Sequence, residues 1–173
     1  MGPSLVCRSA SAGDQRFYRT GHASWFVAMC ERVLGPEYKI IEIGFDTPFQ
    51  GAELQPWHRD FPSPPESYIE HRITSLAFNL TGVDVTEGMG LFEVAPGTQW
   101  DDGRSWNNEM FPSQQLWPRF EGRAVRKFPQ MGDMSCRSAM TVHRGTANPS
   151  RTPCSSSASM HPEPVTTSCT TSW

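Results

Sequence analysis

Residues 55–61 read Gln-Pro-Trp-His-Arg-Asp-Phe and place His58 two positions before Asp60. Along a β-strand, side chains at i and i+2 point to the same face, so one strand can direct both groups at a single metal ion. A second imidazole comes from His143, within Met-Thr-Val-His-Arg-Gly at 140–145. Two imidazoles and one carboxylate leave adjacent positions of an octahedral Fe(II) open for other ligands. His58, Asp60 and His143 are therefore candidate ligands of a metal ion.

Each candidate ligand also has a simpler interpretation. His58 and Asp60 could be an ordinary exposed strand pair, with a surface ion contact from Arg59 or Arg72. His143 follows an apolar run, so it could be a structural histidine of a half-buried strand. The metal interpretation is favoured because other segments of the chain fit the same kind of site.

Three further segments resemble the phytanoyl-CoA dioxygenase family. Residues 90–99, Gly-Leu-Phe-Glu-Val-Ala-Pro-Gly-Thr-Gln, are similar to its G-x-L-x-x-x-P-G-S-H element. A Gly-Asp pair at 132–133 precedes His143 by about ten residues, as in the family's G-D…H pattern, and residues 143–150 are similar to its H-G-S-x-x-N-x-S continuation. Together with the His-x-Asp strand, these matches cover residues 38–153 in the family's order.

Members of that family are Fe(II)- and 2-oxoglutarate-dependent oxygenases. The resemblance implies an all-β core with an N-terminal helix, folded as a double-stranded β-helix, which is a cupin-like jelly roll. It implies that His58, Asp60 and His143 are iron ligands, that Fe(II) and 2-oxoglutarate are cofactors, and that O2 and a small organic molecule are substrates. Because Asp60 is present, it implies hydroxylation of an unactivated C–H bond rather than halogenation, which requires that carboxylate to be replaced.

One position departs from the family pattern. The family places an arginine eleven residues after the distal histidine, where its planar guanidinium pairs with the far carboxylate of 2-oxoglutarate. In this chain that position is Cys154. Arg151, three residues earlier, is the candidate cofactor-binding residue, although its spacing places it on the opposite face of a strand from position 154.

The residues after Pro153 differ in composition from the rest of the chain. Residues 154–173 are rich in Ser and Thr and show no periodicity. Such a segment buries too little apolar surface to offset its ordering entropy, which predicts disorder. A GC-rich back-translation read in a shifted frame begins as an apolar strand. We therefore expect a frameshift after Pro153, a single domain over residues 1–153, an aberrant tail, and a barrel that is incomplete at its C-terminal strand.

Composition narrows the class of protein. A chain of 173 residues with 37% hydrophobic content is expected to form one domain with one core. A net charge of -3 gives no electrostatic footprint for nucleic acid, and no apolar run approaches the length of a membrane span. The five scattered cysteines contain no C-x-x-C pair, which favours reduced thiols in a cytoplasm over a disulfide framework.

Periodicity and turn residues predict the secondary structure. Apolar residues at helical spacing predict an amphipathic helix over 22–34, which ends at Gly-Pro. Residues 98–119, rich in Trp, Asn, Pro and charge, are expected to form a long loop. Short strands punctuated by Gly and Pro are expected at 38–45, 73–80, 90–94, 123–128 and 134–142.

Four aromatic residues are candidates for a substrate pocket that shields the reacting centre from water: Trp57, Phe61, Phe78 and Trp100. Aromatic residues in a β-rich domain more often belong to the core, which is the default interpretation. Two rival functions remain open. One is a cupin-like β-barrel that binds a metal or small ligand without 2-oxoglutarate, with 98–119 as a binding lid. The other is a non-catalytic product of a frameshifted gene.

Overall fold

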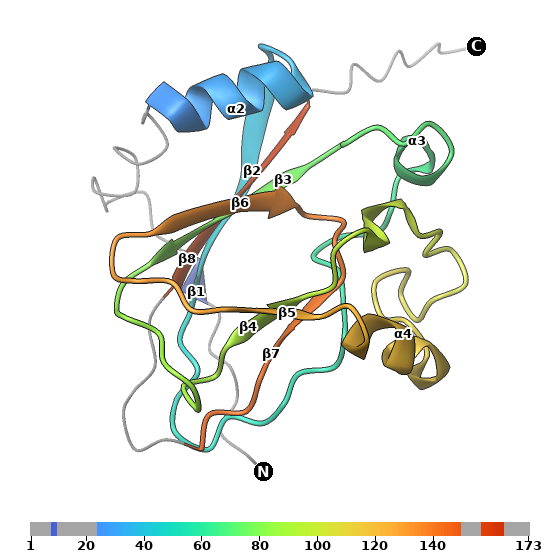
Figure 1. Ribbon diagram of the computed structural model, residues 1–173. Helices are drawn as coiled ribbons and strands as arrows, with labels where there is room; N and C mark the ends of the chain where they lie inside the picture. Colours follow the sequence, from blue (N-terminus) through green and yellow to red (C-terminus); the bar gives the residue numbers. More distant parts are fainter. Residues whose placement is uncertain (1–7, 10–23, 150–156, 165–173) are drawn as a thin grey trace, which may run out of the picture.

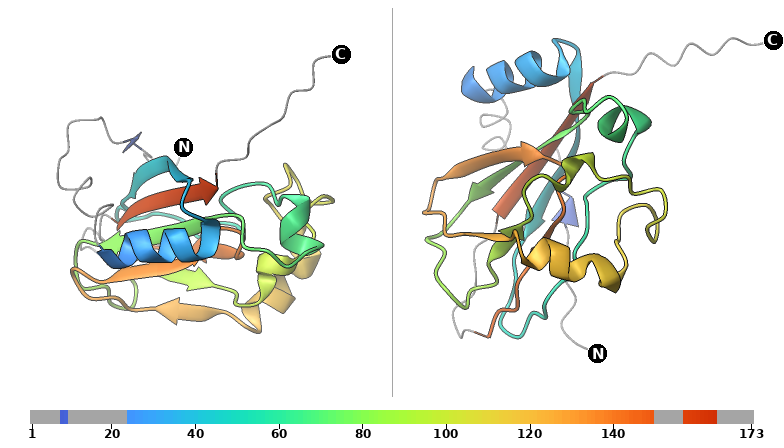
Figure 2. Two further views of the ribbon diagram at one scale, coloured as in Figure 1. Left: turned by 90° about the horizontal axis from the view of Figure 1, so that it is seen from above. Right: turned by 45° about the vertical axis from the view of Figure 1, so that its right-hand side comes forward.

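The computed structural model describes residues 8–9, 24–149 and 157–164, and Figure 1 shows two β-sheets facing each other. The larger sheet has five strands in the order β1-β2-β8-β3-β6, and the smaller has three in the order β5-β4-β7. Figure 2 shows the sheets as two layers. The elements are β1 (Arg8–Ser9), α2 (Ser24–Leu34), β2 (Tyr38–Asp46), α3 (Pro65–Tyr68), β3 (Leu76–Thr81), β4 (Phe92–Val94), η1 (Thr98–Trp100), η2 (Gln114–Leu116), α4 (Trp117–Glu121), β5 (Val125–Lys127), β6 (Met134–Ser138), β7 (His143–Gly145) and β8 (Ser157–Pro164), where η marks a 3-10 helix.

The helix expected over 22–34 is α2, and it covers one face of the larger sheet. Phe26 and Cys30 are about one helical turn apart, and both are fully buried against that sheet. The ring centroid of Phe26 lies 4.3 Å from that of Phe78 on β3. The helix is followed by Gly35, whose φ of 99° is the left-handed conformation that favours glycine. The predicted helix and its stop signal are confirmed.

The larger sheet is completed by β8, which pairs antiparallel with β2 on one side and β3 on the other. We expected the barrel to lack this strand, but part of 154–173 fills its place. A strand ladder is made by backbone N–H and C=O groups, which a Ser- and Thr-rich segment also offers. The register on β2 shifts between Ile40 and Glu42, next to Pro162, which has no N–H to donate. The frameshift itself stays a prediction, to be checked by sequencing the source gene.

The strand expected over 134–142 is shorter than predicted. β6 ends at Ser138, and the next residues turn, with the Thr141 N–H donating to the Ser138 carbonyl at 3.1 Å. The alternation of the sequence does not reveal this turn, because residues 139–142 are all buried between the layers. The chain crosses here from the larger to the smaller sheet and delivers His143 to the start of β7. The other predicted strands are confirmed, with shifted ends.

The long loop expected over 98–119 contains η1, η2 and the start of α4. It packs on the smaller sheet and forms a second core, which we call the loop-side core. Within the described residues, no helix is long and apolar enough to cross a membrane. The buried members of the loop-side core are Trp57, Ala95, Trp106, Phe120 and Val142.

Arg59 links this loop to the segment that carries His58 and Asp60 through hydrogen bonds. Its guanidinium is buried and donates to the backbone carbonyls of Thr98 and Asp101, each at 2.7 Å. It also lies 4.3 Å from the ring centroid of Trp106, as a cation–π contact. Burial lowers the pKa of Arg59 to about 10, so the group stays charged at neutral pH.

Glu93 on β4 joins the three strands of the smaller sheet. Its carboxylate, 4% exposed, accepts hydrogen bonds from Arg126 on β5 at 2.8 Å and from Arg144 on β7 at 2.7 Å. Both arginines are also its direct cross-strand partners in register. Burial raises the pKa of Glu93, but the hydrogen bonds and charges of Arg144 and Arg126 outweigh it, so the pKa is lowered overall.

We expect Glu93→Gln to destabilise the fold by about 1–3 kcal/mol at neutral pH, because an amide replaces a buried carboxylate that accepts two charge-assisted bonds. Since the folded pKa lies below the unfolded one, this stabilisation is present above the ordinary pKa of 4.5 and is lost as the pH falls through the folded pKa. Urea unfolding at neutral and acidic pH measures both effects. The control is Glu87→Gln, which removes an exposed carboxylate 3.7 Å from Arg126. A gap to wild type that persists in acid would contradict this assignment.

Candidate metal centre

His58 and Asp60 lie on an extended segment that borders β7. His58 and His143 form an isolated antiparallel bridge, in which each backbone N–H donates to the carbonyl of the other at 2.9 Å. Side chains along the segment alternate, since Trp57 and Arg59 are buried toward the loop-side core. His58 and Asp60 therefore face the other way, toward His143. The bridge brings the predicted ligands to one place from two distant parts of the sequence.

Both imidazole rings are oriented by nearby backbone. Nδ1 of His58 lies 2.8 Å from the Pro56 carbonyl oxygen, and Nδ1 of His143 lies 2.9 Å from that of Thr141. A carbonyl can only accept, so each Nδ1 carries a proton. The neutral imidazole of His58 therefore keeps its lone pair on Nε2, while Nε2 of His143 faces the Asp60 carboxylate. The ring centroids are 4.4 Å apart. Fixing the tautomer through the second ring nitrogen is how proteins commonly prepare histidines for a metal.

The Asp60 carboxylate lies beside the second imidazole. Its Oδ1 is 3.2 Å from His143 Nε2. Two ligands at right angles on one ion, each with a bond of about 2.1 Å, lie about 3.0 Å from each other. The separation of Asp60 and His143 is therefore close to what a shared ion would require.

In the structure, the side chain of Arg137 on β6 contacts the atoms of Asp60 and His143 that would bind a metal. Its Nη1 donates to Asp60 Oδ2 at 2.7 Å, and its Nη2 lies 3.4 Å from His143 Nε2. As the side chains stand, no group of three or more His, Cys, Asp or Glu in the described part of the chain is arranged to hold a metal ion. Two imidazoles and one carboxylate are a set of groups that fits a metal ion. In the structure two of these groups, Asp60 and His143, are in contact with the Arg137 guanidinium instead.

The surroundings keep two of the candidate ligands in the protonation states that bind metals. Burial, together with the neighbouring His143, lowers the pKa of His58 to about 4, so this imidazole is neutral at neutral pH. Burial raises the pKa of Asp60, but the charges and hydrogen bonds of His143 and Arg137 outweigh it and hold the pKa well below its usual value. A neutral imidazole and an ionised carboxylate are the forms that coordinate metals.

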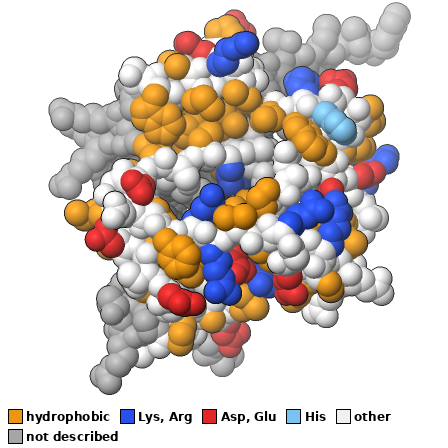
Figure 3. Space-filling view, in the orientation of Figure 1, with side chains coloured by type: hydrophobic (Ala, Val, Ile, Leu, Met, Phe, Trp, Pro, Cys, Tyr) orange, Lys and Arg blue, Asp and Glu red, His pale blue; other side chains and the backbone are white. Residues whose placement is uncertain are grey.

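Two cavities open beside these side chains. The first, which we call the β4–β6 cavity, has a volume of about 350 Å³, and Arg137 and Phe92 are among its walls. The second, which we call the β2–β3 cavity, has a volume of about 360 Å³ and includes Asn79 and Phe92. Lys127 borders both cavities. Figure 3 shows this face of the molecule hollowed near its centre, with Lys or Arg atoms inside the hollow.

Two aromatic rings that the sequence interpretation did not single out flank the imidazoles. The ring centroid of Phe92 lies 5.1 Å from that of His143, and the ring of Phe111 stacks on His58 at 5.8 Å. They shield the candidate ligands on two sides. Phe92 belongs to the strand at 90–94 and Phe111 to the long loop, so the two rings come from different elements.

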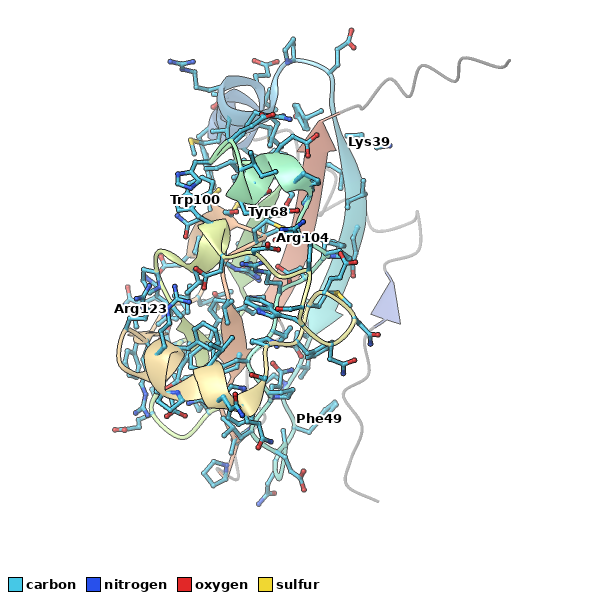
Figure 4. All side chains as sticks on the ribbon, turned by 90° about the vertical axis from the view of Figure 1, so that its right-hand side faces the viewer. Lys39, Phe49, Tyr68, Trp100, Arg104 and Arg123 are labelled. Carbon is cyan, nitrogen blue, oxygen red and sulfur yellow. The ribbon has the colours of Figure 1, made fainter. Side chains whose placement is uncertain are left out.

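The four aromatic residues proposed as a pocket lie elsewhere. Trp57 and Phe78 are fully buried, Trp57 in the loop-side core and Phe78 beneath α2, so the default interpretation as core holds for both. Phe61 is half-buried against the inner face of the larger sheet. Trp100 stacks on His71 with the centroids 5.3 Å apart, on the side of the molecule shown in Figure 4. Among the described walls of the two cavities, none of the four aromatic residues is present.

The candidate cofactor-binding residue, Arg151, and the departure at Cys154 lie outside the described residues. The sequence interpretation did not single out Arg137, although a signal was available. Met134 and Cys136 on β6 pack beneath α2. Because side chains alternate along a strand, Arg137 must face the space between the sheets. An arginine at an inward position of a barrel strand is unusual enough to mark a functional site.

Comparison with solved structures identifies the architecture. EctD from S. alaskensis, solved with 2-oxoglutarate and 5-hydroxyectoine, superposes with a TM-score of 0.69 at 16% identity, over 89% of this chain and 54% of that one. This chain has the double-stranded β-helix fold. The non-heme alpha ketoglutarate dependent epimerase SnoN from nogalamycin biosynthesis gives a TM-score of 0.69 at 20% identity, over 95% and 63%. HygX from Streptomyces hygroscopicus, with nickel and 2-oxoglutarate bound, gives 0.68 at 12% identity, over 94% and 71%.

The double-stranded β-helix expected from the sequence is thereby confirmed. Its larger sheet contains the order β2-β8-β3-β6 and faces β5-β4-β7, with the His58–His143 bridge continuing the smaller sheet. No protein-family model and no curated protein sequence matches this chain. The chain spans about half the length of EctD, since it covers 54% of that protein.

Proposed function

We propose that this protein is an Fe(II)- and 2-oxoglutarate-dependent oxygenase of the phytanoyl-CoA dioxygenase kind, with His58, Asp60 and His143 as the iron ligands. The observation that carries the proposal is the 3.2 Å separation of His143 Nε2 and Asp60 Oδ1, beside the imidazole of His58, whose Nδ1 is bonded to backbone and whose Nε2 is left for a metal. The solved relatives with bound iron or nickel and 2-oxoglutarate support it through the shared fold.

The residues of this chain would orient the ligands and exclude water. The Pro56 and Thr141 carbonyls hold the two imidazoles in one tautomer. The rings of Phe92 and Phe111 cover the imidazoles, which keeps bulk water from the centre. When bound, iron with 2-oxoglutarate would supply the oxidising chemistry that hydroxylates an unactivated C–H bond of a small organic substrate, with O2 as oxidant.

A second candidate function is a cupin-like β-barrel that binds a metal or small ligand without 2-oxoglutarate. The observation that favours it is Cys154, at the position where the family has its cosubstrate arginine. On this view the candidate ligands still bind a metal or a small ligand, and the missing arginine is no defect.

Conversion of 2-oxoglutarate to succinate separates the two functions without knowledge of the substrate. We expect the purified chain with Fe(II), 2-oxoglutarate and air to form succinate, and we expect a chelator to reduce this to the level without iron. Arg104→Gln is the matched control, because it removes an exposed charge paired with Asp102 and should change nothing. One bound iron per chain without succinate formation would favour the metal-binding barrel.

We further propose a cytoplasmic location. Cys30 and Cys136, which both pack beneath α2, are free thiols. Burial raises the pKa of the Cys30 thiol to about 12 and that of Cys136 to about 11, so both stay protonated at neutral pH. Free cysteines of this kind are usual in a reducing compartment.

A further inference from the structure

Arg137 connects the candidate ligands with the β4–β6 cavity. It starts from β6 opposite Ala77 of β3, forms part of the cavity wall, and ends in hydrogen bonds at Asp60. Its side chain is 13% exposed. Its Nε is buried and has no hydrogen-bond partner among the described residues. A buried guanidinium that leaves one N–H unpaired is an incomplete arrangement, since buried polar groups are normally satisfied.

The charge of the β4–β6 cavity selects an anionic ligand. Lys127 and Arg137 are both positively charged, and no Asp or Glu is present among the described residues of its wall. Its volume of about 350 Å³ suits a small molecule. Hydroxyl groups that could donate to such an anion come from Ser135, Ser138 and Thr141.

A bound metal ion and the present position of Arg137 exclude each other. The guanidinium uses a carboxylate oxygen of Asp60, and its Nη2 lies 3.4 Å from His143 Nε2, and these are the atoms that a metal would take. A divalent cation there would also repel the guanidinium at short range. Arg137 would then turn into the cavity beside it, as a buried cation without its carboxylate. A buried cation in that position requires an anionic partner.

We propose that Arg137 binds the far carboxylate of 2-oxoglutarate from the β4–β6 cavity, after a metal ion has displaced it from Asp60. This inference rests on the proposed function. A metal held by His58, Asp60 and His143 would not neutralise the far carboxylate of a bound 2-oxoglutarate, so that carboxylate would need its own cation. A planar guanidinium can hold that carboxylate through two parallel hydrogen bonds. Arg137 on β6 thus takes the role that the family assigns to the position of Cys154, which a cysteine cannot perform.

Calorimetric titration of the Ni(II)-loaded full chain tests the proposal, because nickel allows binding to be measured without turnover. We expect Arg137→Gln to weaken 2-oxoglutarate binding by about 10- to 100-fold, the usual effect of losing a charge-assisted pair. Arg137→Lys should recover little of this, since a lysine lacks the planar fork. Binding of 2-oxopentanoate, which has no far carboxylate, should be the same in wild type and Arg137→Gln. Arg104→Gln is the control for loss of an exposed arginine.

Nickel affinity gives a second readout that does not depend on the cosubstrate. Arg137→Gln should bind Ni(II) at least as tightly as wild type, because the competitor for Asp60 is gone. Weaker Ni(II) binding by a variant with wild-type circular dichroism would overturn the displacement, and unchanged 2-oxoglutarate binding would overturn the anchoring role. An equal loss of 2-oxopentanoate binding in Arg137→Gln would also overturn the anchoring role. The same holds for a loss of 2-oxoglutarate binding that appears in Lys127→Gln but not in Arg137→Gln. Failure of the proposed function is distinct, since the wild-type chain would then bind no Ni(II) at His58, Asp60 and His143.

Discussion

Asp60→Asn is expected to abolish stoichiometric Fe(II) or Ni(II) binding, with at least a 100-fold loss of affinity. The substitution keeps the shape of the side chain but removes the negative charge, which is the only anionic ligand in the proposed set of Asp60, His58 and His143. Changing groups that merely support a metal ligand already costs about 10- to 100-fold, so loss of an anionic ligand should cost more. Anaerobic titration with either metal ion, followed by metal analysis after gel filtration, measures the effect.

The control for Asp60→Asn is Asp102→Asn, the same change at an exposed carboxylate paired with Arg104. It should bind metal like wild type. Because Asp60→Asn also leaves Arg137 without a charged partner, its fold should be checked by circular dichroism before metal binding is judged. A folded Asp60→Asn variant with wild-type metal affinity would remove Asp60 from the site and end the oxygenase proposal.

Trp57→Ala is expected to destabilise the fold by about 3–5 kcal/mol, the usual range for truncating a buried aromatic side chain. Trp57 is fully buried, its ring centroid lies 5.9 Å from that of Phe120, and the Arg144 guanidinium lies 4.3 Å from its ring. Its removal leaves a cavity directly behind the segment that carries His58. Urea unfolding of the metal-free chain gives the difference in free energy of unfolding.

Trp100→Ala is the matched comparison, since Trp100 is only half-buried and its ring stacks on the exposed His71. Its removal should cost no more than about 1 kcal/mol. A Trp57→Ala variant as stable as Trp100→Ala would contradict the placement of Trp57 in the loop-side core. It would reopen the interpretation of Trp57 as a residue that lines a substrate pocket.

Local patterns were sufficient to predict much of the fold. The helical spacing of Trp25, Phe26, Met29 and Val33 and the stop at Gly35 were sufficient to predict α2. The i, i+2 spacing of His58 and Asp60 places them on one face, and their approach to His143 was predicted through the family resemblance. The helix and the shared face of His58 and Asp60 depend on short stretches whose periodicity is visible in the sequence itself.

Features that depend on long-range pairing were not predicted. The place of β8 is set by the open edges of β2 and β3, which its own sequence, with two serines, two prolines and no β-branched residue, does not reveal. The turn after Ser138 is hidden because both layers bury its residues. Alternation along β6 can indicate that Arg137 faces inward, but its hydrogen bond to Asp60 depends on how the two sheets pack.

The buried guanidinium of Arg59 connects the loop at 98–111 to the segment that carries the candidate ligands His58 and Asp60. Arg59 stands between His58 and Asp60, and its hydrogen bonds end on the loop carbonyls of Thr98 and Asp101. The two candidate ligands are therefore held in place by this loop as well as by the isolated His58–His143 bridge. Changes in that loop, where substrate selectivity would evolve, should be transmitted as small rotations of the coordinating groups. In the proposed oxygenase, a change of specificity in this loop would therefore also alter the alignment of the candidate ligands.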